Sequence, residues 1–222
     1  MMNPEQARFN MVEQQIRTWE VLDPDVLELL HVVKREEFVP PAYRNIAFAD
    51  LEIPLGTSGD SMHRMWPPKL EARALQALQV QASDEVLEIG TGSGYLSALL
   101  ARQARSVVSV EIDEGLATTA RDRLAAHGIA NVTVEVGDGA SGWQAGRLFD
   151  VIVLTGSTEE LPPAFLDQLR GGGRLFAIVG TEPAMHGRLY TRSEAGTIQR
   201  RDLFETVVAP LENAMHPERF VF

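Results

Sequence analysis

The stretch Val86-Leu87-Glu88-Ile89-Gly90-Thr91-Gly92-Ser93-Gly94-Tyr95 decides the fold class of this 222-residue chain. Its first residues form a strand-like apolar run, and the glycines that follow are spaced G-x-G-x-G where a helix is expected to begin. Glycine at such a turn lets a ligand approach the backbone closely. Nucleotide-dependent dehydrogenases also have glycines at this point, so the spacing alone does not identify the ligand.

Short strand-like runs alternate with helical segments after this loop. We predict strands at residues 86–89, 107–110, 132–134, 151–154 and 175–179, and helices at residues 95–102, 115–127 and 162–169. This alternation is typical of a parallel sheet flanked by helices. Residues 189–190 and 204–208 alternate like antiparallel strands at one edge. The predicted fold is a doubly wound, mostly parallel, Rossmann-like α/β sheet with helices on both faces, an N-terminal helical extension and an antiparallel C-terminal edge.

Acidic residues stand at the ends of three predicted strands. Glu88 lies two residues before the first glycine, Glu111 ends the second strand, and Asp138 stands between two glycines after the third. A carboxylate at Glu88 would repel a pyrophosphate but attract the ammonium and sulfonium groups of S-adenosylmethionine. Glu111 is placed to accept ribose hydroxyls, which would suit NAD equally well, and Asp138 to accept an adenine amino group. The alternatives are that Glu88 caps the loop and that Asp138 belongs to a plain turn.

These features, in this order, resemble the protein-L-isoaspartate O-methyltransferase family, whose members use S-adenosylmethionine. The resemblance covers most of the chain and is found at residues 11–16, 35–40, 53–56, 88–95, 109–111, 137–139 and 172–175. It implies a methyltransferase that transfers a methyl group to the free carboxylate of an isoaspartyl residue in a damaged protein, which is a protein-repair reaction.

The resemblance also implies where the cofactor binds. In that family the glycine loop holds the methionine moiety, the acid after the second strand holds the ribose, and the aspartate of Gly-Asp-Gly faces the adenine. The implied cofactor-binding residues are Glu88, Gly90, Thr91, Gly92, Ser93, Gly94, Glu111, Ile112, Gly137, Asp138, Gly139 and Thr155. Thr155 belongs to Thr155-Gly156-Ser157, for which a helix N-cap is the alternative. No metal site is predicted.

The first 80 residues are expected to be mainly helical. Asn3-Pro4 and Asp23-Pro24 each combine an N-cap with a proline at the first helical position, and helical spacing of apolar residues resumes at Leu70. Prolines and glycines punctuate residues 42–68, which predicts an irregular loop kept for function. We therefore divide the chain into residues 1–80, the helical extension with the acceptor loop, and residues 81–222, the S-adenosylmethionine-binding methyltransferase domain, in one compact unit.

The acceptor loop departs from the family where it should hold the substrate carboxylate. The family has a Gly-Gln-Thr-Ile-Ser-like segment there, whereas this chain has Arg64 in place of the threonine and Trp66 in place of the serine. The predicted catalytic residues are Ser58, Ser61 and Arg64, since hydroxyls or a guanidinium can hold a carboxylate.

Other residues of the same loop have open interpretations. Lys69 could also grip the acceptor carboxylate as a point charge. Met62, Met65 and Trp66 could line a pocket for an apolar small molecule or merely pack the loop down. We expect His63 to be a surface loop histidine rather than a base.

Composition excludes several other classes of protein. The chain has no cysteine, which excludes disulfides, thiolate metal sites and cysteine nucleophiles. Its net charge of -11 disfavours nucleic acid, and we expect Lys34-Arg35 and Arg200-Arg201 on the solvated surface. No apolar run approaches the roughly 20 residues that cross a bilayer, and no signal peptide is visible. We therefore expect a cytoplasmic protein that binds neither nucleic acid nor membranes.

The altered loop leaves more than one function open. The chain could keep the fold and cofactor but methylate a small molecule, or it could bind S-adenosylmethionine without catalysis. An NAD-dependent reductase is a more distant alternative.

Overall fold

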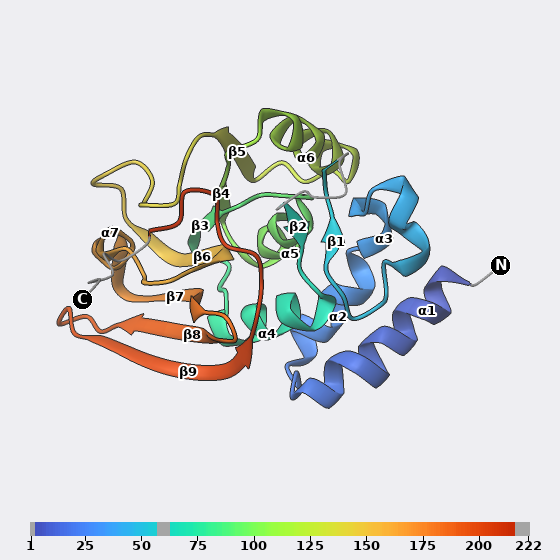
Figure 1. Cartoon of the computed structure of the whole chain (residues 1–222), viewed down its shortest axis with the longest axis horizontal. Coiled ribbons are helices and arrows are strands. Elements are labelled where there is room, and N and C mark those ends of the chain that lie inside the picture. Colours follow the sequence, from blue (N-terminus) through green and yellow to red (C-terminus); the bar gives the residue numbers. More distant parts are fainter. Residues whose placement is uncertain (1–2, 57–62, 216–222) are drawn as a thin grey trace, which may run out of the picture.

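One seven-stranded sheet forms the centre of the molecule. The structure is a computed structural model that describes residues 3–56 and 63–215. The strands lie in the order β5-β4-β3-β6-β7-β8-β9, from β5 at the top of Figure 1 to β9 at the bottom. Their bounds are β3 Glu85–Ile89, β4 Ser106–Glu111, β5 Val132–Val136, β6 Phe149–Thr158, β7 Leu169–Thr181, β8 Ala184–Arg192 and β9 Ile198–Thr206. The pairs from β5 to β7 are parallel, and β8 and β9 are antiparallel. The predicted doubly wound sheet with an antiparallel C-terminal edge is confirmed.

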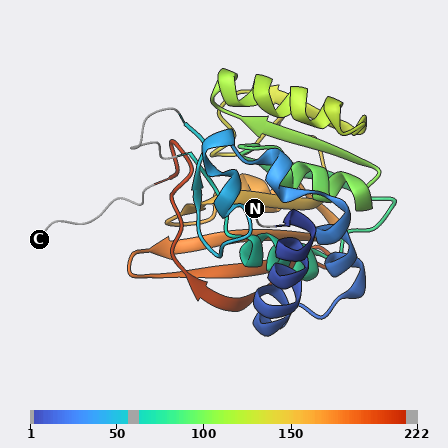
Figure 2. The ribbon, with the colours of Figure 1, turned by 90° about the vertical axis from the view of Figure 1, so that its right-hand side faces the viewer.

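Helices cover both faces of the sheet. The helical elements are α1 Pro4–Asn10, η1 Met11–Ile16, η2 Arg17–Trp19, α2 Pro24–Val32, α3 Arg35–Phe38, η3 Pro41–Ile46, α4 Pro68–Leu78, α5 Tyr95–Gln103, α6 Glu114–Ala126 and α7 Pro163–Asp167. The N-terminal helices α1, α2 and α3 lie together at one end of the molecule (Figures 1 and 2). They share one hydrophobic cluster with α4, α5 and α6, whereas α7 packs in a second cluster on the other face.

Alternation along β3 decides which of its side chains can reach the helices. Val86 belongs to the larger cluster with α4 and α5, while Leu87 and Ile89 belong to the cluster with α7. Because successive side chains of a strand point to opposite faces, Glu88 shares the face of Val86. The sheet therefore directs the Glu88 carboxylate toward α4 and α5 at the end of a central strand.

Several predicted boundaries differ from the structure. The helix expected at residues 162–169 is only α7, because the chain enters β7 at Leu169. The segment 42–68 is less irregular than expected, since it contains η3 and a small hairpin in which β1 (Ile53–Pro54) pairs with β2 (Arg64–Met65). We call this pair of strands the acceptor hairpin. No helix in the part of the chain that the structure describes is long and apolar enough to span a membrane.

The expectation that Arg35 lies on the solvated surface is wrong. Its side chain is fully buried, and its guanidinium pairs with Glu71 of α4 and donates to the carbonyl oxygens of Ala47 (2.9 Å) and Trp66 (2.5 Å). These acceptors satisfy the buried charge, and Arg35 thereby ties α3 to α4 and to the acceptor hairpin. Its neighbour Lys34 is exposed, as expected.

Candidate cofactor and acceptor site

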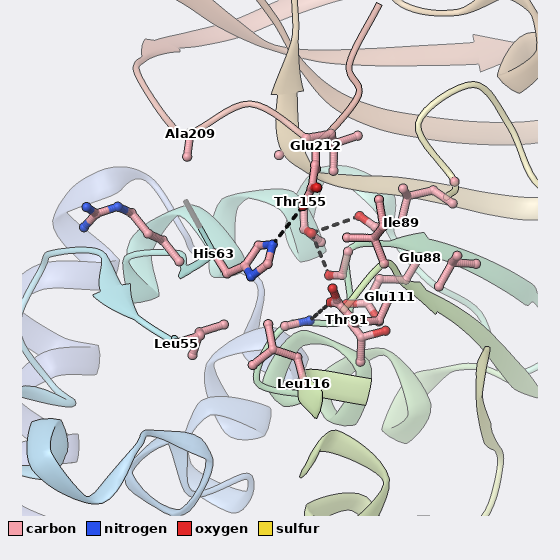
Figure 3. Close-up of a pocket in the computed structure, with 18 of the residues that line it drawn as sticks. Leu55, His63, Glu88, Ile89, Thr91, Glu111, Leu116, Thr155, Ala209 and Glu212 are labelled. Atoms are coloured by element: carbon pink, nitrogen blue, oxygen red, sulfur yellow. Dashed lines mark hydrogen bonds and ion pairs between the residues drawn. The ribbon is translucent and has the colours of Figure 1, made fainter. Parts of the chain in front are cut away.

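A pocket opens at the carboxyl ends of β3, β4 and β6, beneath the acceptor hairpin (Figure 3). Its empty volume is about 900 Å³, including the open mouth. The predicted cofactor-binding residues that line it are Glu88, Gly90, Thr91, Gly92, Ser93, Glu111, Ile112, Gly137, Asp138, Gly139 and Thr155. Gly94 is not among the lining residues and instead forms the N-cap of α5. Ligands of open α/β sheets bind at this edge. The structure therefore gathers eleven of the twelve predicted residues around one pocket, and their contact with a cofactor stays a prediction.

The glycine loop has a backbone that only glycine tolerates well at its first position. Gly90 has a φ of +94°, and a Cβ there would lie 2.2 Å from Thr155 Oγ1. That hydroxyl donates to the carbonyl oxygens of Ile89 (2.9 Å) and Gly90 (2.6 Å). Thr155 lies inside β6, so the helix N-cap alternative is wrong for it, and its hydroxyl braces the loop.

Glu88 forms the buried floor of the pocket. Its Oε2 accepts hydrogen bonds from the hydroxyls of Ser109 (2.5 Å) and Ser97, and its Oε1 is buried with no hydrogen-bond partner among the described residues. Burial raises the pKa of Glu88 to about 7, against the opposing effect of the two serines, and nearby Glu111 raises it further. Because its partners are hydroxyls rather than backbone N–H groups, Glu88 does not cap the loop, and it offers a free acceptor to a cationic ligand.

Glu111 holds the glycine loop from the neighbouring strand. Its Oε2 accepts from the backbone N–H of Gly92 at 2.7 Å, and its Oε1 accepts from that of Asp113 at 3.1 Å. The side chain is buried at the end of β4. Each carboxylate oxygen retains further acceptor capacity, so the same group can brace the loop and accept a ligand hydroxyl.

Asp138 lies at the far end of the pocket, after β5. Its Oδ1 accepts from the backbone N–H of Ala140, and its Oδ2 accepts from Asn213 Nδ2, both at 3.0 Å. Neighbouring Gly137 leaves room for Trp143, because a Cβ there would lie 2.4 Å from the indole ring. The turn therefore presents an oriented carboxylate rather than a plain connection.

The acceptor hairpin forms the opposite wall. Arg64 is exposed, lines the pocket and has its Nε 3.9 Å from Glu52 Oε2. Burial raises the pKa of Glu52. Met65 and Trp66 are buried and also line the pocket, and Trp66 packs edge-on against Phe176 with ring centroids 6.2 Å apart. Met65 and Trp66 therefore pack against the protein interior and also face the pocket, while an apolar small molecule as their ligand stays a prediction.

Two predicted catalytic residues and one loop residue lie outside the described part of the chain. These residues are Ser58, Ser61 and Met62.

Lys69 and His63 lie differently with respect to this wall, and the structure does not support a role for Lys69 in holding the acceptor. Lys69 does not line the pocket, because its Nζ pairs with Asp50 Oδ2 at 2.6 Å and lies 3.9 Å from the centroid of the Trp19 ring. His63 is partly exposed, lines the pocket and has its Nε2 3.3 Å from Glu212 Oε2 (Figure 3).

Several pocket residues were missed by the sequence analysis. They are Glu52, Leu55, Glu71, Leu96, Leu116, Ala209, Pro210, Leu211 and Glu212. Glu71 had a detectable signal, since it is a charged residue beside Leu70 on the apolar side of α4. Burial raises its pKa to about 8, against the opposing effect of Arg35. Residues 209–212 carried no motif, because long-range packing alone brings them to the pocket.

No group of three or more metal-binding side chains is present within residues 3–56 and 63–215.

Comparisons with known proteins agree with this arrangement. The model of the family described as protein-L-isoaspartate(D-aspartate) O-methyltransferase matches residues 6–216. The protein-L-isoaspartate O-methyltransferase 2 of Syntrophobacter fumaroxidans is 40% identical over 191 residues, which are 86% of this chain and 76% of the relative. The protein-L-isoaspartate O-methyltransferase of Koribacter versatilis is 37% identical over 206 residues, covering 92% and 90% of the two chains.

A solved structure shows the same fold. It is that of a Plasmodium falciparum protein described as a protein-L-isoaspartate O-methyltransferase, in complex with S-adenosyl-L-homocysteine. The two chains superimpose with a TM-score of 0.75 at 18% identity, over 96% of this chain and 99% of the other. With the family model matching nearly the whole sequence, the chain belongs to the protein-L-isoaspartate(D-aspartate) O-methyltransferase family.

Proposed function

We propose that this chain is an S-adenosylmethionine-dependent O-methyltransferase that esterifies the free carboxylate of isoaspartyl residues in damaged proteins and peptides. Membership of the family and the names of relatives at about 40% identity support the reaction. The observation in this chain that carries the proposal is the buried Oε1 of Glu88 at the floor of the pocket, which has no hydrogen-bond partner among the residues that the structure describes. A buried acceptor without a partner is costly, and a cationic ligand would satisfy it.

The residues present fit S-adenosylmethionine. Glu88, Glu111 and Asp138 stand at the ends of three neighbouring strands, β3, β4 and β5. Such a row of carboxylates would attract an ammonium and a sulfonium and repel a pyrophosphate, which argues against NAD. We assign Glu88 to the ammonium, Glu111 to the ribose hydroxyls and Asp138 to the adenine amino group.

Other lining residues would shape the same site. The residues assigned to close contact with the cofactor through backbone or small side chains are Gly90, Thr91, Gly92, Ser93, Ile112, Gly137, Gly139 and Thr155. When bound, the cofactor supplies a methyl group on a sulfonium, a good leaving group.

The chain itself contributes positioning rather than acid or base catalysis. An isoaspartyl carboxylate is ionised at neutral pH, so its oxygen forms the new bond to the methyl carbon as the sulfur–carbon bond breaks, and no proton has to move. Alignment of two reactants can lower the activation free energy by about 7–11 kcal/mol. We assign the orientation of the acceptor carboxylate to Arg64, with Ser58 and Ser61 as further candidates. The exclusion of water falls to Trp66 and Met65.

A methyl-transfer assay with paired peptides tests the proposal. S-adenosylmethionine carrying a labelled methyl group is incubated with two peptides that differ only in an isoaspartyl or an aspartyl linkage. We expect base-labile label, as formed by a methyl ester, in the isoaspartyl peptide alone. Glu88→Ala should abolish it, while Glu205→Ala, at an exposed carboxylate of β9, should not.

A small-molecule acceptor is the second candidate, favoured by the buried Met65 and Trp66 in the acceptor wall. Binding of S-adenosylhomocysteine without label in the isoaspartyl peptide would contradict the first proposal. A metabolite that then becomes labelled would establish the second, and none would indicate binding without catalysis. The cytoplasmic location and the division at residue 80 stay predictions.

A further inference from the structure

Residues 209–214, here called the C-terminal segment, lie at the carboxyl end of the central strand β6. Pro210 forms a parallel bridge with Ser157 of β6. The backbone N–H of Ser157 donates to Ala209 O at 3.0 Å, and that of Leu211 donates to Ser157 O at 2.9 Å. The Ser157 hydroxyl also donates to Val208 O at 3.0 Å. The segment is thus anchored to the end of a central strand and forms one side of the pocket.

Two consecutive residues of this segment contact two different residues that line the pocket. Glu212 Oε2 lies 3.3 Å from His63 Nε2 at the acceptor end, and Asn213 Nδ2 donates to Asp138 Oδ2 at 3.0 Å at the adenine end. Residues 63 and 138 come from the acceptor hairpin and from the turn after β5, which are far apart in the sequence. A short backbone turn, in which the N–H of Ala214 donates to Leu211 O at 3.0 Å, holds the two contacts together.

Asn213 also has a backbone that few side chains tolerate. Its φ is +61°, in the left-handed region where asparagine and glycine are the favoured residues. Asparagine therefore combines the required backbone with a carboxamide donor. Replacement by glycine would keep the backbone and remove only the donor, which makes the contribution of the side chain separable from that of the turn.

We propose that Glu212 and Asn213 are positioning residues that couple the adenine end of the pocket to its acceptor end. Asn213 orients the Asp138 carboxylate toward the adenine amino group, and Glu212 orients His63 toward the acceptor. Cofactor that engages Asp138 stabilises the turn and, through the adjacent residue, the position of His63. The assignment of the two ends rests on the proposed function, but the coupling can be measured with the cofactor product alone.

Coupling between two sites is reciprocal, so it should appear as a response of His63 to a ligand at the far end. The probe is S-adenosylhomocysteine at saturation and fixed pH, and the readout is the NMR signal of the His63 imidazole, assigned among the five histidines by its loss in His63→Gln. His186, which lies 3.7 Å from Glu205 on β8 and β9, is an internal control. We expect the ligand to move the His63 signal and leave that of His186 in place.

Three variants separate coupling from direct contact. Asn213→Gly and Glu212→Gln should each remove most of the His63 response at saturation, and Asn213→Gly should weaken S-adenosylhomocysteine binding about threefold to tenfold. Glu205→Gln, a matched change in the histidine–glutamate pair that contains the control His186, should alter neither. Unfolding midpoints measured beside each titration ensure that only folded variants are compared.

Different results overturn different proposals. A full His63 response in Asn213→Gly at saturation, or unchanged affinity in that variant, overturns the coupling. A normal response with no methylation of an isoaspartyl peptide by the parent protein overturns the proposed acceptor and leaves the coupling intact.

Discussion

Ser109 Oγ lies 2.5 Å from Glu88 Oε2, in the buried floor between β3 and β4. The hydroxyl stabilises the ionised carboxylate, yet burial outweighs it and raises the pKa of Glu88 to about 7. A carboxylate that must be charged to bind a cationic ligand is therefore close to its titration point near neutral pH.

Cofactor binding should accordingly depend on pH. From about pH 7 up to the pH at which the ligand's own ammonium loses its proton, Glu88 is ionised in the free protein and affinity for S-adenosylhomocysteine should be constant. Below pH 7 a proton must leave before the ammonium can pair, so affinity should fall about tenfold for each pH unit. Calorimetric titrations across this range test the slope.

Two variants identify the group responsible for this dependence. Glu88→Gln should bind weakly at every pH and show a flat profile. Ser109→Ala removes a bond to the charged form, so the fall should begin at higher pH. A parent profile without slope would refute the predicted pH dependence. A slope that persists in Glu88→Gln would assign the dependence to another group.

Arg35 gives a stability prediction. Its buried guanidinium holds Glu71 and the carbonyl oxygens of Ala47 and Trp66. Arg35→Met leaves the buried Glu71 carboxyl and the two carbonyl oxygens without their donor, and each buried group left unsatisfied costs about 1–3 kcal/mol, so the free energy of unfolding should fall by at least about 3 kcal/mol. The double variant Arg35→Met with Glu71→Leu should recover part of that loss, while Lys34→Met, next in the chain and exposed, should have little effect. Urea denaturation measures all three, and a parent-like Arg35→Met would refute the structural role.

The sequence predicted the parallel strands β3 to β7 and most residues that line the pocket at their carboxyl ends, because both depend on local patterns, whereas it predicted β8 and β9 only in part. Glu88, Gly90 and Glu111 are placed by a strand, a tight turn and the next strand, so their positions follow once the parallel sheet is recognised. The length of β7 was missed because Gly171, Gly172 and Gly173 favour a turn locally, although these residues lie within the strand.

The positions of the side chains around the acceptor hairpin depend on contacts between residues that are distant in the sequence. No local motif in a single sequence predicts such contacts. Arg35 resembles a surface cation until Glu71 is seen opposite it. Glu212 and Asn213 follow no recognisable pattern, and they come to the pocket residues His63 and Asp138 in a segment that Ser157 anchors. Predictions for charged side chains therefore failed for Arg35 and Lys69, whose partners Glu71 and Asp50 are 36 and 19 residues away.

Gly156 tests whether the C-terminal segment must lie close to β6. A Cβ at this position would lie 2.7 Å from the backbone nitrogen of Leu211 and 2.9 Å from its Cδ2. Gly156→Ala should therefore push the segment outward and weaken S-adenosylhomocysteine binding about tenfold. Gly128→Ala is the control, since it also adds a methyl group but has open space around the Cβ. Its φ of +67° is left-handed, so this variant carries backbone strain and should still bind S-adenosylhomocysteine like the parent. Equal affinity in Gly156→Ala and the parent would show that the segment is not needed for cofactor binding.

Lys69 and Arg64 offer a direct contrast between two cations near the acceptor wall. Lys69 pairs with Asp50 and lies over the Trp19 ring, outside the pocket, so Lys69→Ala should lower the free energy of unfolding by about 1 kcal/mol. It should leave the KM for an isoaspartyl peptide unchanged. Arg64 lines the pocket and is held only at 3.9 Å from Glu52, so Arg64→Ala should raise that KM at least about tenfold with little loss of stability. Steady-state kinetics and denaturation on both variants decide the matter: a KM effect confined to Lys69→Ala would mean that the acceptor binds on the other side of the hairpin.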